Sequence, residues 1–171
     1  MTSDEWYTPR SAVVPIIEYL KPNSRVLCPF DTENSNFVKA LTERGFQVTH
    51  SHISEGVDFF SLPKPDVDYV ISNPPFSKFD RILTKLYEWG IPFAMVWTSN
   101  RIFDSRERIA CAVGGGGNLI PLPPGVIPNG RKENIPHAEL SELLLVPRDP
   151  AEADPICRNR TGTMRRTDIN L

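Results

Sequence analysis

The chain has few cysteines, no long apolar run and no excess of positive charge, and each absence excludes a class of protein. Its three cysteines include no Cys-x-x-Cys spacing, so neither a disulfide framework nor a metal site is expected. Because no apolar run approaches about 18 residues and no signal-peptide pattern is present, we expect a cytoplasmic protein with no membrane partner. The net charge of −2 does not draw the whole surface to nucleic acid, so such a contact requires a local patch.

The apolar content is sufficient for one folded domain. The 171 residues are 40% hydrophobic and 23% charged, which fits a single α/β domain over residues 1–147. From residue 148 onward the sequence is polar and broken by prolines, so we expect a poorly ordered tail at 148–171. Four arginines make this tail a candidate basic patch, although a solvated tail is the simpler interpretation: Arg158, Arg160, Arg165 and Arg166.

Apolar residues recur with helical and strand periods in alternation. The pattern predicts helices over 11–20, 34–44, 79–89 and 101–111, and strands over 25–28, 46–49, 69–72, 93–97, 119–122 and 143–146. Strands separated by helices indicate βαβ units and a mainly parallel sheet. We expect Gly45 and Gly90 to end the second and third helices. The four glycines at 114–117 are not a phosphate loop, since no Lys-Ser/Thr follows them.

The most informative motif is Asn73-Pro74-Pro75-Phe76, directly after the predicted strand at 69–72. Two prolines restrict φ and remove two backbone donors, which leaves a rigid loop of acceptors. The Asn73 side-chain oxygen and the Pro74 carbonyl can accept hydrogen bonds from one amino group, while Phe76 offers a flat face to a ring. Such a loop suits the activation of a ring-conjugated amino group for attack on a methyl sulfonium. An ordinary proline turn is the alternative for the motif taken alone.

Three other segments precede this motif in the chain. In order, the four segments are DEWYTP at 4–9, VLCPF at 26–30, GVDFF at 56–60 and NPPF at 73–76. Together they resemble the S-adenosylmethionine-dependent amino-methyltransferases, and more narrowly the small phage and prophage DNA adenine-N6 methyltransferases. The resemblance covers about residues 4–147. It implies a three-layer Rossmann-like methyltransferase fold, with a mostly parallel seven-stranded sheet and an antiparallel end strand.

The resemblance also implies a role for each matching residue. The expected cofactor is S-adenosylmethionine, bound by Tyr7, Thr8, Pro9, Pro29, Phe30, Asp31, Asp58, Phe59 and Asn73. The expected catalytic residues are Asn73, Pro74, Pro75 and Phe76. Asp58 would accept from the cofactor's adenine N6, and Phe59 would stack beside that adenine or lie in the core. Thr8 and Pro9 also fit a helix start, as the N-cap and the first helical residue.

The loop after the first strand departs from the family pattern. Cys28 stands where the family has an acid, and Thr32 and Asn34 stand at its glycine positions. Asp31 is a candidate for the missing charge from a shifted position, and Asn34 tolerates left-handed geometry better than most residues. The second strand also lacks the acid that holds the ribose. His52 or Glu55 could replace that acid, while a surface histidine is the simpler interpretation.

The function implied is methyl transfer from S-adenosylmethionine to the N6 of adenine in DNA, so DNA is the expected partner. A duplex adenine must flip out of the stack or be single-stranded. Contacts to nucleic acid are expected at basic residues that could equally be solvated: Lys78, Arg101, Arg106, Arg131 and Lys132. So small a recognition region suggests a short site or a homodimer. Two alternatives stay open: methylation of RNA adenine or a protein glutamine amide, and a catalytically silent methyltransferase-fold binding protein.

Overall fold

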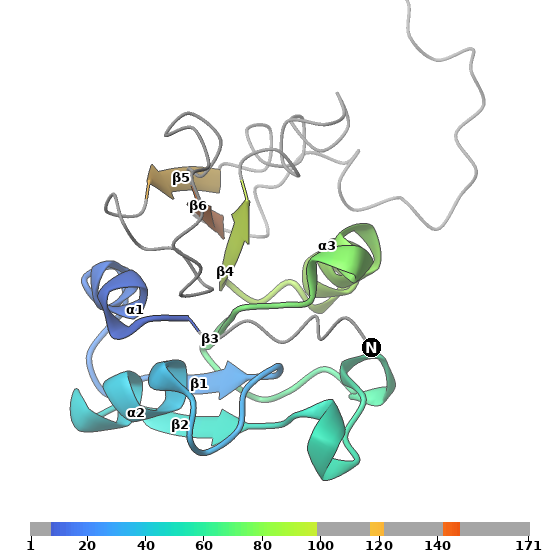
Figure 1. The fold of residues 1–171 in the computed structure, drawn as a ribbon, viewed down its shortest axis with the longest axis horizontal. Helices are drawn as coiled ribbons and strands as arrows, with labels where there is room; N and C mark the ends of the chain where they lie inside the picture. Colours follow the sequence, from blue (N-terminus) through green and yellow to red (C-terminus); the bar gives the residue numbers. More distant parts are fainter. Residues whose placement is uncertain (1–7, 99–116, 122–141, 148–171) are drawn as a thin grey trace, which may run out of the picture.

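The computed structural model describes residues 8–98, 117–121 and 142–147 (Figure 1). Along the first range the elements are α1 (Arg10–Ile17), β1 (Arg25–Cys28), α2 (Asn36–Glu43), β2 (Gln47–His50), the 3-10 turns η1 (Ile53–Glu55) and η2 (Phe59–Ser61), β3 (Tyr69–Ser72), the 3-10 turn η3 (Phe76–Lys78), α3 (Phe79–Trp89) and β4 (Phe93–Thr98). The other two ranges hold β5 (Gly117–Pro121) and β6 (Glu142–Pro147). The predicted helix at 101–111 and the predicted tail lie outside the described residues.

The strands form one sheet in the order β2-β1-β3-β4-β6-β5. The first four strands are parallel, as the pairing of Val26 with both Val48 and Tyr69 illustrates. β6 is antiparallel to β4 and to β5. The predicted α/β class is therefore confirmed: a four-stranded parallel sheet alternates with helices and is Rossmann-like in part.

The described residues contain six strands, so the seven strands implied by the resemblance stay a prediction. Residues 51–68, between β2 and β3, form η1 and η2 instead of a strand. Pro63 and Pro65 lie in this segment, and each removes a backbone donor that a strand ladder would use. The antiparallel strand, β6, is the last of these strands in the chain but pairs inside the sheet, between β4 and β5.

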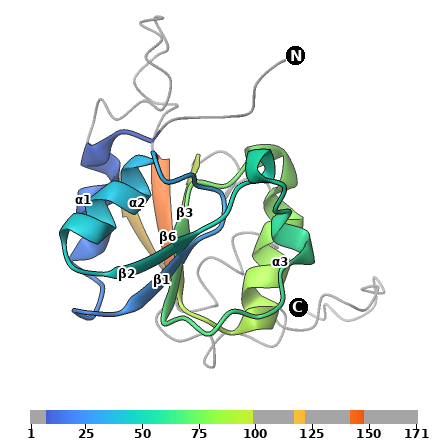
Figure 2. The same ribbon diagram turned by 90° about the horizontal axis from the view of Figure 1, so that it is seen from below.

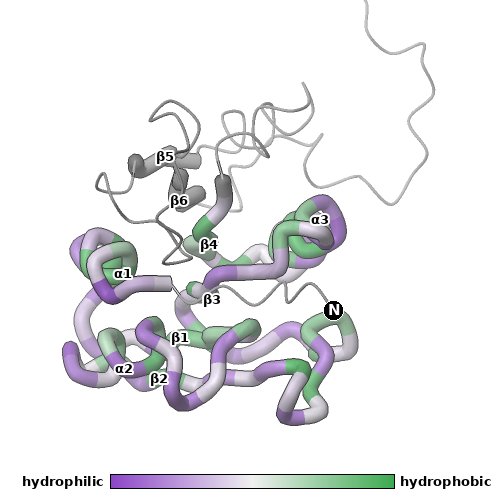
Figure 3. The backbone as a smooth tube through the Cα atoms, in the orientation of Figure 1, coloured by the Kyte–Doolittle hydropathy of each residue, from purple (hydrophilic) through white to green (hydrophobic). Residues whose placement is uncertain are grey.

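Helices cover both faces of the parallel part of the sheet (Figure 2). Alternate strand residues point to opposite faces, because the side-chain period of a strand is two. Val26, Cys28 and Ile71 pack in one core cluster with α1 and α2. The second cluster, against α3, contains Leu27 and Val70. The mixture of hydrophobic and hydrophilic residues along each helix in Figure 3 agrees with helices that bury one side only.

The start of α1 corrects one expectation. Pro9, rather than Thr8, is the N-cap, and no side chain caps the helix. Thr8 is buried, and its carbonyl accepts a hydrogen bond of 2.8 Å from Asn36 Nδ2 at the start of α2. This contact between distant segments explains why the local capping pattern did not predict the position of Thr8.

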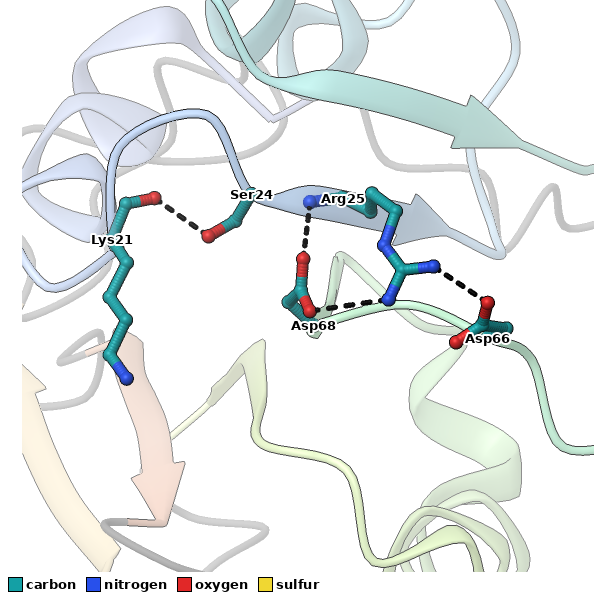
Figure 4. Close-up of polar contacts among 5 residues, drawn as sticks. All are labelled: Lys21, Ser24, Arg25, Asp66 and Asp68. Carbon is teal, nitrogen blue, oxygen red and sulfur yellow. Dashed lines mark hydrogen bonds and ion pairs between the residues drawn. The ribbon is translucent and has the colours of Figure 1, made fainter.

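Arg25 joins the amino ends of β1 and β3 (Figure 4). Its backbone N–H donates to Asp68 Oδ2 at 2.8 Å, and its guanidinium donates to Asp66 at 2.7 Å and to Asp68 at 3.4 Å. Ser24 Oγ closes the preceding turn with a 2.8 Å hydrogen bond to the Lys21 carbonyl. The backbone N–H and the guanidinium of Arg25 hold the pKa of Asp68 below its usual value. Since these charges are solvent-exposed, solvent screening weakens each ion pair.

Both glycines predicted to end helices have left-handed backbone, with φ of 85° at Gly45 and 60° at Gly90. A Cβ added at Gly90 would meet no atom within 4 Å, so a side chain there costs conformational energy only. We predict that Gly90→Ala lowers the free energy of unfolding by about 1 kcal/mol, and that Gly90→Asn lowers it less. Urea unfolding of the three proteins tests this. Equal effects of Ala and Asn would contradict the backbone explanation.

Candidate functional site

The parallel strands create a topological switch point between β1 and β3. After β1 the chain continues to β2 on one side, and β3 then pairs with the other side of β1. The loops that follow these two strands therefore diverge at the carboxyl edge of the sheet. Open α/β sheets bind ligands in the crevice at this position.

A cavity of about 420 Å³, here called the switch-point cavity, lies at this edge. The loops after β1, β2 and β3 and the start of α2 supply most of its walls. Its lining contains most of the predicted cofactor and catalytic residues: Thr8, Pro29, Phe30, Asp31, Asp58, Phe59, Asn73, Pro74 and Pro75. Segments far apart in the sequence thus converge on one site, and the fold brings them together as the resemblance implied.

Of the remaining predicted site residues, only Lys78 among those that the structure describes also lines the cavity. Lys78 is exposed at the cavity, with its Nζ 5.6 Å from the Phe60 ring centroid. Pro9 is outside the lining, and so is Phe76, which packs against the core cluster beneath α3. Five predicted residues lie outside the described part of the chain: Tyr7, Arg101, Arg106, Arg131 and Lys132.

Asp31 is the buried charge of the cavity, with a relative exposure of 7%. Burial raises its pKa from 3.8 to about 6, against the opposite effects of hydrogen bonds from Ser72 and Ser35 and of the nearby His52 and His50. Among the described residues, no lysine or arginine forms an ion pair with Asp31. A buried carboxylate in this setting can accept a cationic ligand group.

Cys28 does not replace the family's acid. Its side chain is fully buried in the cluster with α1 and α2, and burial raises the pKa of its thiol well above the usual value. Asp31, three residues later, lines the cavity. The left-handed geometry considered for Asn34 is wrong, because Asn23 is the one non-glycine residue with positive φ in the described part. The Ser35 N–H donates to the Thr32 carbonyl at 3.0 Å, which closes a turn that needs no glycine.

Aromatic rings and a second carboxylate line another part of the cavity. The Phe30 and Phe59 ring centroids are 4.7 Å apart with an interplanar angle of 46°. Phe59 both lines the cavity and packs in the core, at 5.2 Å from Trp89, so its two predicted roles are compatible. Asp58 Oδ1 accepts from the Phe60 N–H at 3.0 Å, which holds the carboxylate at the start of η2.

Of the two candidates for holding a ribose, the structure brings His52 to the cavity and not Glu55. Glu55 Oε2 instead lies 3.7 Å from His50 Nδ1. His52 caps η1, because its Nδ1 accepts from the Ser54 N–H at 3.2 Å. The neutral ring then carries its proton on Nε2, which makes it a donor where the family has an acceptor.

Sequence reasoning missed several polar residues around the cavity, among them Ser35, Asn36 and Ser72. Ser35 and Asn36, at the start of α2, line it, and Ser72 binds two residues of its wall. The available signal for Ser72 was a hydroxyl at the end of an otherwise apolar strand. Among the described residues, no group of three or more His, Cys, Asp or Glu side chains could hold a metal ion, and no helix is long and apolar enough to cross a membrane.

Comparison with protein-family models and with curated protein sequences finds no match. The functional interpretation therefore depends on the geometry of the site itself.

We predict that Asp31→Asn stabilises the protein at neutral pH. Since the folded-state pKa of Asp31 is raised, the native state loses stability relative to the unfolded chain as the pH rises from about 4 to about 6. The variant should match wild type near pH 4 and exceed it at pH 7.5 by roughly 2–3 kcal/mol. Urea unfolding across this range measures the difference, with Glu33→Gln, an exposed carboxylate in the same loop, as control. A pH-independent difference would contradict the prediction.

Proposed function

We propose that this protein is an S-adenosylmethionine-dependent methyltransferase that methylates the N6 amino group of adenine in DNA. The observation that carries the proposal is the convergence of Thr8, Phe30, Asp58 and the Asn73-Pro74-Pro75 loop on one cavity at the switch point. The proposal includes the finer fold, a three-layer Rossmann-like methyltransferase domain over residues 1–147. The parallel order of β2, β1, β3 and β4, with helices on both faces, supports that assignment.

The cavity fits the proposed cofactor in size and in chemistry. Its volume of about 420 Å³ falls in the range of roughly 300–1,000 Å³ that is usual for small-molecule sites. The Asp31 carboxylate, buried and without a lysine or arginine partner in the described residues, suits the positive methionine end. Phe30 and Phe59 offer aromatic surface to the adenine, and Asp58 can accept from its amino group. The His52 ring can donate to a ribose hydroxyl.

The residues after β3 would act on the amino group of the substrate. When bound, the cofactor supplies an electrophilic methyl group. The Asn73 side-chain oxygen and the Pro74 carbonyl would accept the two amino hydrogens, which localises the nitrogen lone pair for attack. The amino nitrogen would take the methyl group from the sulfonium as the carbon–sulfur bond broke, and the surplus amino proton would leave to water. Pro74 is buried and Pro75 half-buried, which supports a loop held in place before substrate arrives.

The substrate base would approach from the side of Phe76 and Lys78. Phe76 is half-buried outside the switch-point cavity, so a ring stacked on it would not compete with the cofactor. Lys78 is exposed at the start of α3 and can contact a phosphate. Contacts to DNA from Arg101, Arg106, Arg131 and Lys132, and a homodimer, are further parts of the proposal.

The decisive experiment is transfer of tritiated methyl from S-adenosylmethionine to duplex DNA, single-stranded DNA, RNA and a glutamine-containing peptide. We predict label in DNA adenine, and a loss of at least 100-fold for Asn73→Ala, because a preorganised acceptor is removed. Asn34→Ala, in an exposed loop outside the cavity lining, serves as control and should keep the label. Calorimetry should show that Asn73→Ala still binds cofactor.

The other outcomes identify the alternatives. Label confined to RNA or to the peptide would change the substrate class while keeping the chemistry. A folded wild-type protein that neither binds cofactor nor transfers methyl would replace the proposal with a silent binding protein. Full activity of Asn73→Ala would refute the catalytic assignment.

A separate prediction concerns Asp58, which lines the cavity from η2. Asp58→Ala should weaken cofactor binding by about 1–3 kcal/mol, roughly 5- to 150-fold in Kd, because a charged hydrogen-bond acceptor is lost. Asp66→Ala is the matched control, since this exposed carboxylate binds Arg25 at the other end of the sheet. Equal Kd values for the two variants would exclude the role of Asp58.

A further inference from the structure

Ser72 is the last residue of β3, and it is completely buried. Its hydroxyl has two partners in the loop after β1. Ser72 Oγ accepts from the Phe30 N–H at 3.3 Å and donates to Asp31 Oδ2. One side chain on β3 therefore binds two consecutive residues of the cavity wall that follows β1.

This bridge lies beyond the end of the strand pairing. In the β1–β3 ladder, Val26 lies opposite Tyr69 and Leu27 opposite Val70, and no later pair continues it. Ser72 thus connects the two segments where their backbones have separated. Because Asn73 is the next residue, the side chain at position 72 links the position of the catalytic loop to that of the Asp31 loop.

The bridge also shapes the environment of the buried carboxylate. The Asp31 carboxylate accepts hydrogen bonds from the hydroxyls of Ser72 in β3 and Ser35 at the start of α2. The other titratable groups near it are His50 at the end of β2, His52 in the loop after β2, and Cys28 of β1. Of the two hydroxyls, only that of Ser72 directly precedes the Asn-Pro-Pro segment.

We propose that Ser72 is a positioning residue, whose hydroxyl sets the distance between the cofactor-binding carboxylate of Asp31 and the catalytic loop that begins at Asn73. This inference rests on the proposed methyltransferase function and adds a residue to it. Ser72 touches neither the methyl group nor the substrate. It acts by fixing the position of the Asp31 loop relative to the catalytic loop. A small error in that position lowers the reaction rate by a large factor.

The test compares Ser72→Ala with Ser24→Ala in the full-length protein. Ser24 is a matched control, since it is 7% exposed and its hydroxyl binds the Lys21 carbonyl at the opposite end of the sheet. NMR titration of the labelled Asp31 carboxyl gives a readout without cofactor. Ser72→Ala should raise the pKa of Asp31, because a donor to its charged form is lost, and Ser24→Ala should leave it unchanged.

The kinetic part separates positioning from simple destabilisation. At saturating cofactor, at a temperature where every variant is folded, Ser72→Ala should lower kcat by roughly 10- to 100-fold, while Ser24→Ala keeps it. The same variant should also raise the Kd for S-adenosylmethionine. Combining Ser72→Ala with Asp31→Ala should lose less than the product of the two single effects, because both substitutions break one contact.

Two results would overturn the inference, and they can be told apart. If wild type transfers methyl but Ser72→Ala behaves like Ser24→Ala in the Asp31 pKa and in kcat, the bridge has no role and the proposed function stands. If wild type neither binds cofactor nor transfers methyl, the proposed function fails, and the role of Ser72 toward the cofactor fails with it. The NMR titration would still report whether the hydroxyl binds Asp31.

Discussion

The pairing of β1 with β3 is the constraint on which the rest of the structure depends. At the amino end an exposed set of contacts joins the two strands through Arg25 and Asp68, and at the carboxyl end the buried Ser72 hydroxyl joins them. Solvent weakens the exposed contacts of Arg25, whereas burial strengthens the hydrogen bonds of Ser72. Between them the ladder places Val26 and Leu27 on opposite faces, so one pair of strands organises both core clusters. The crevice exists because the chain leaves these strands in opposite directions.

The buried Asp31 carboxylate suits a binding site but lowers the stability of the folded protein. A carboxylate at 7% exposure is costly to ionise, and its raised pKa measures that cost. Two hydroxyls reduce the cost without removing it. Perturbed acids of this kind are concentrated at functional sites, and this one lines the cavity at the switch point.

The sequence predictions were accurate where interactions between residues close together in the chain decide the structure. The strands at 25–28 and 69–72 and the helix at 79–89 have the predicted bounds, because apolar period and a terminal glycine act locally. Predictions were wrong where a distant contact decided. Asn36 holds the Thr8 carbonyl, so Pro9 takes the cap position. For Asn34 a local turn decided instead, since the Ser35 N–H binds the Thr32 carbonyl and keeps Asn34 out of the left-handed region. The parts of the prediction at 99–116 and 122–141 lie outside the described residues.

The sequence by itself determined the α/β class, the segments that form the site, and the rigid Asn73-Pro74-Pro75 loop, because these depend on periodicity and on the restricted backbone of proline. Tertiary structure alone decided which polar groups face the cavity. Cys28 turns toward α1 and α2 while Asp31 lines the cavity, and His52 rather than Glu55 reaches it. These outcomes depend on the side of the sheet that each loop meets. Strand order, and packing between residues far apart in the chain, decide on which side each loop lies, and no local sequence pattern predicts either of them.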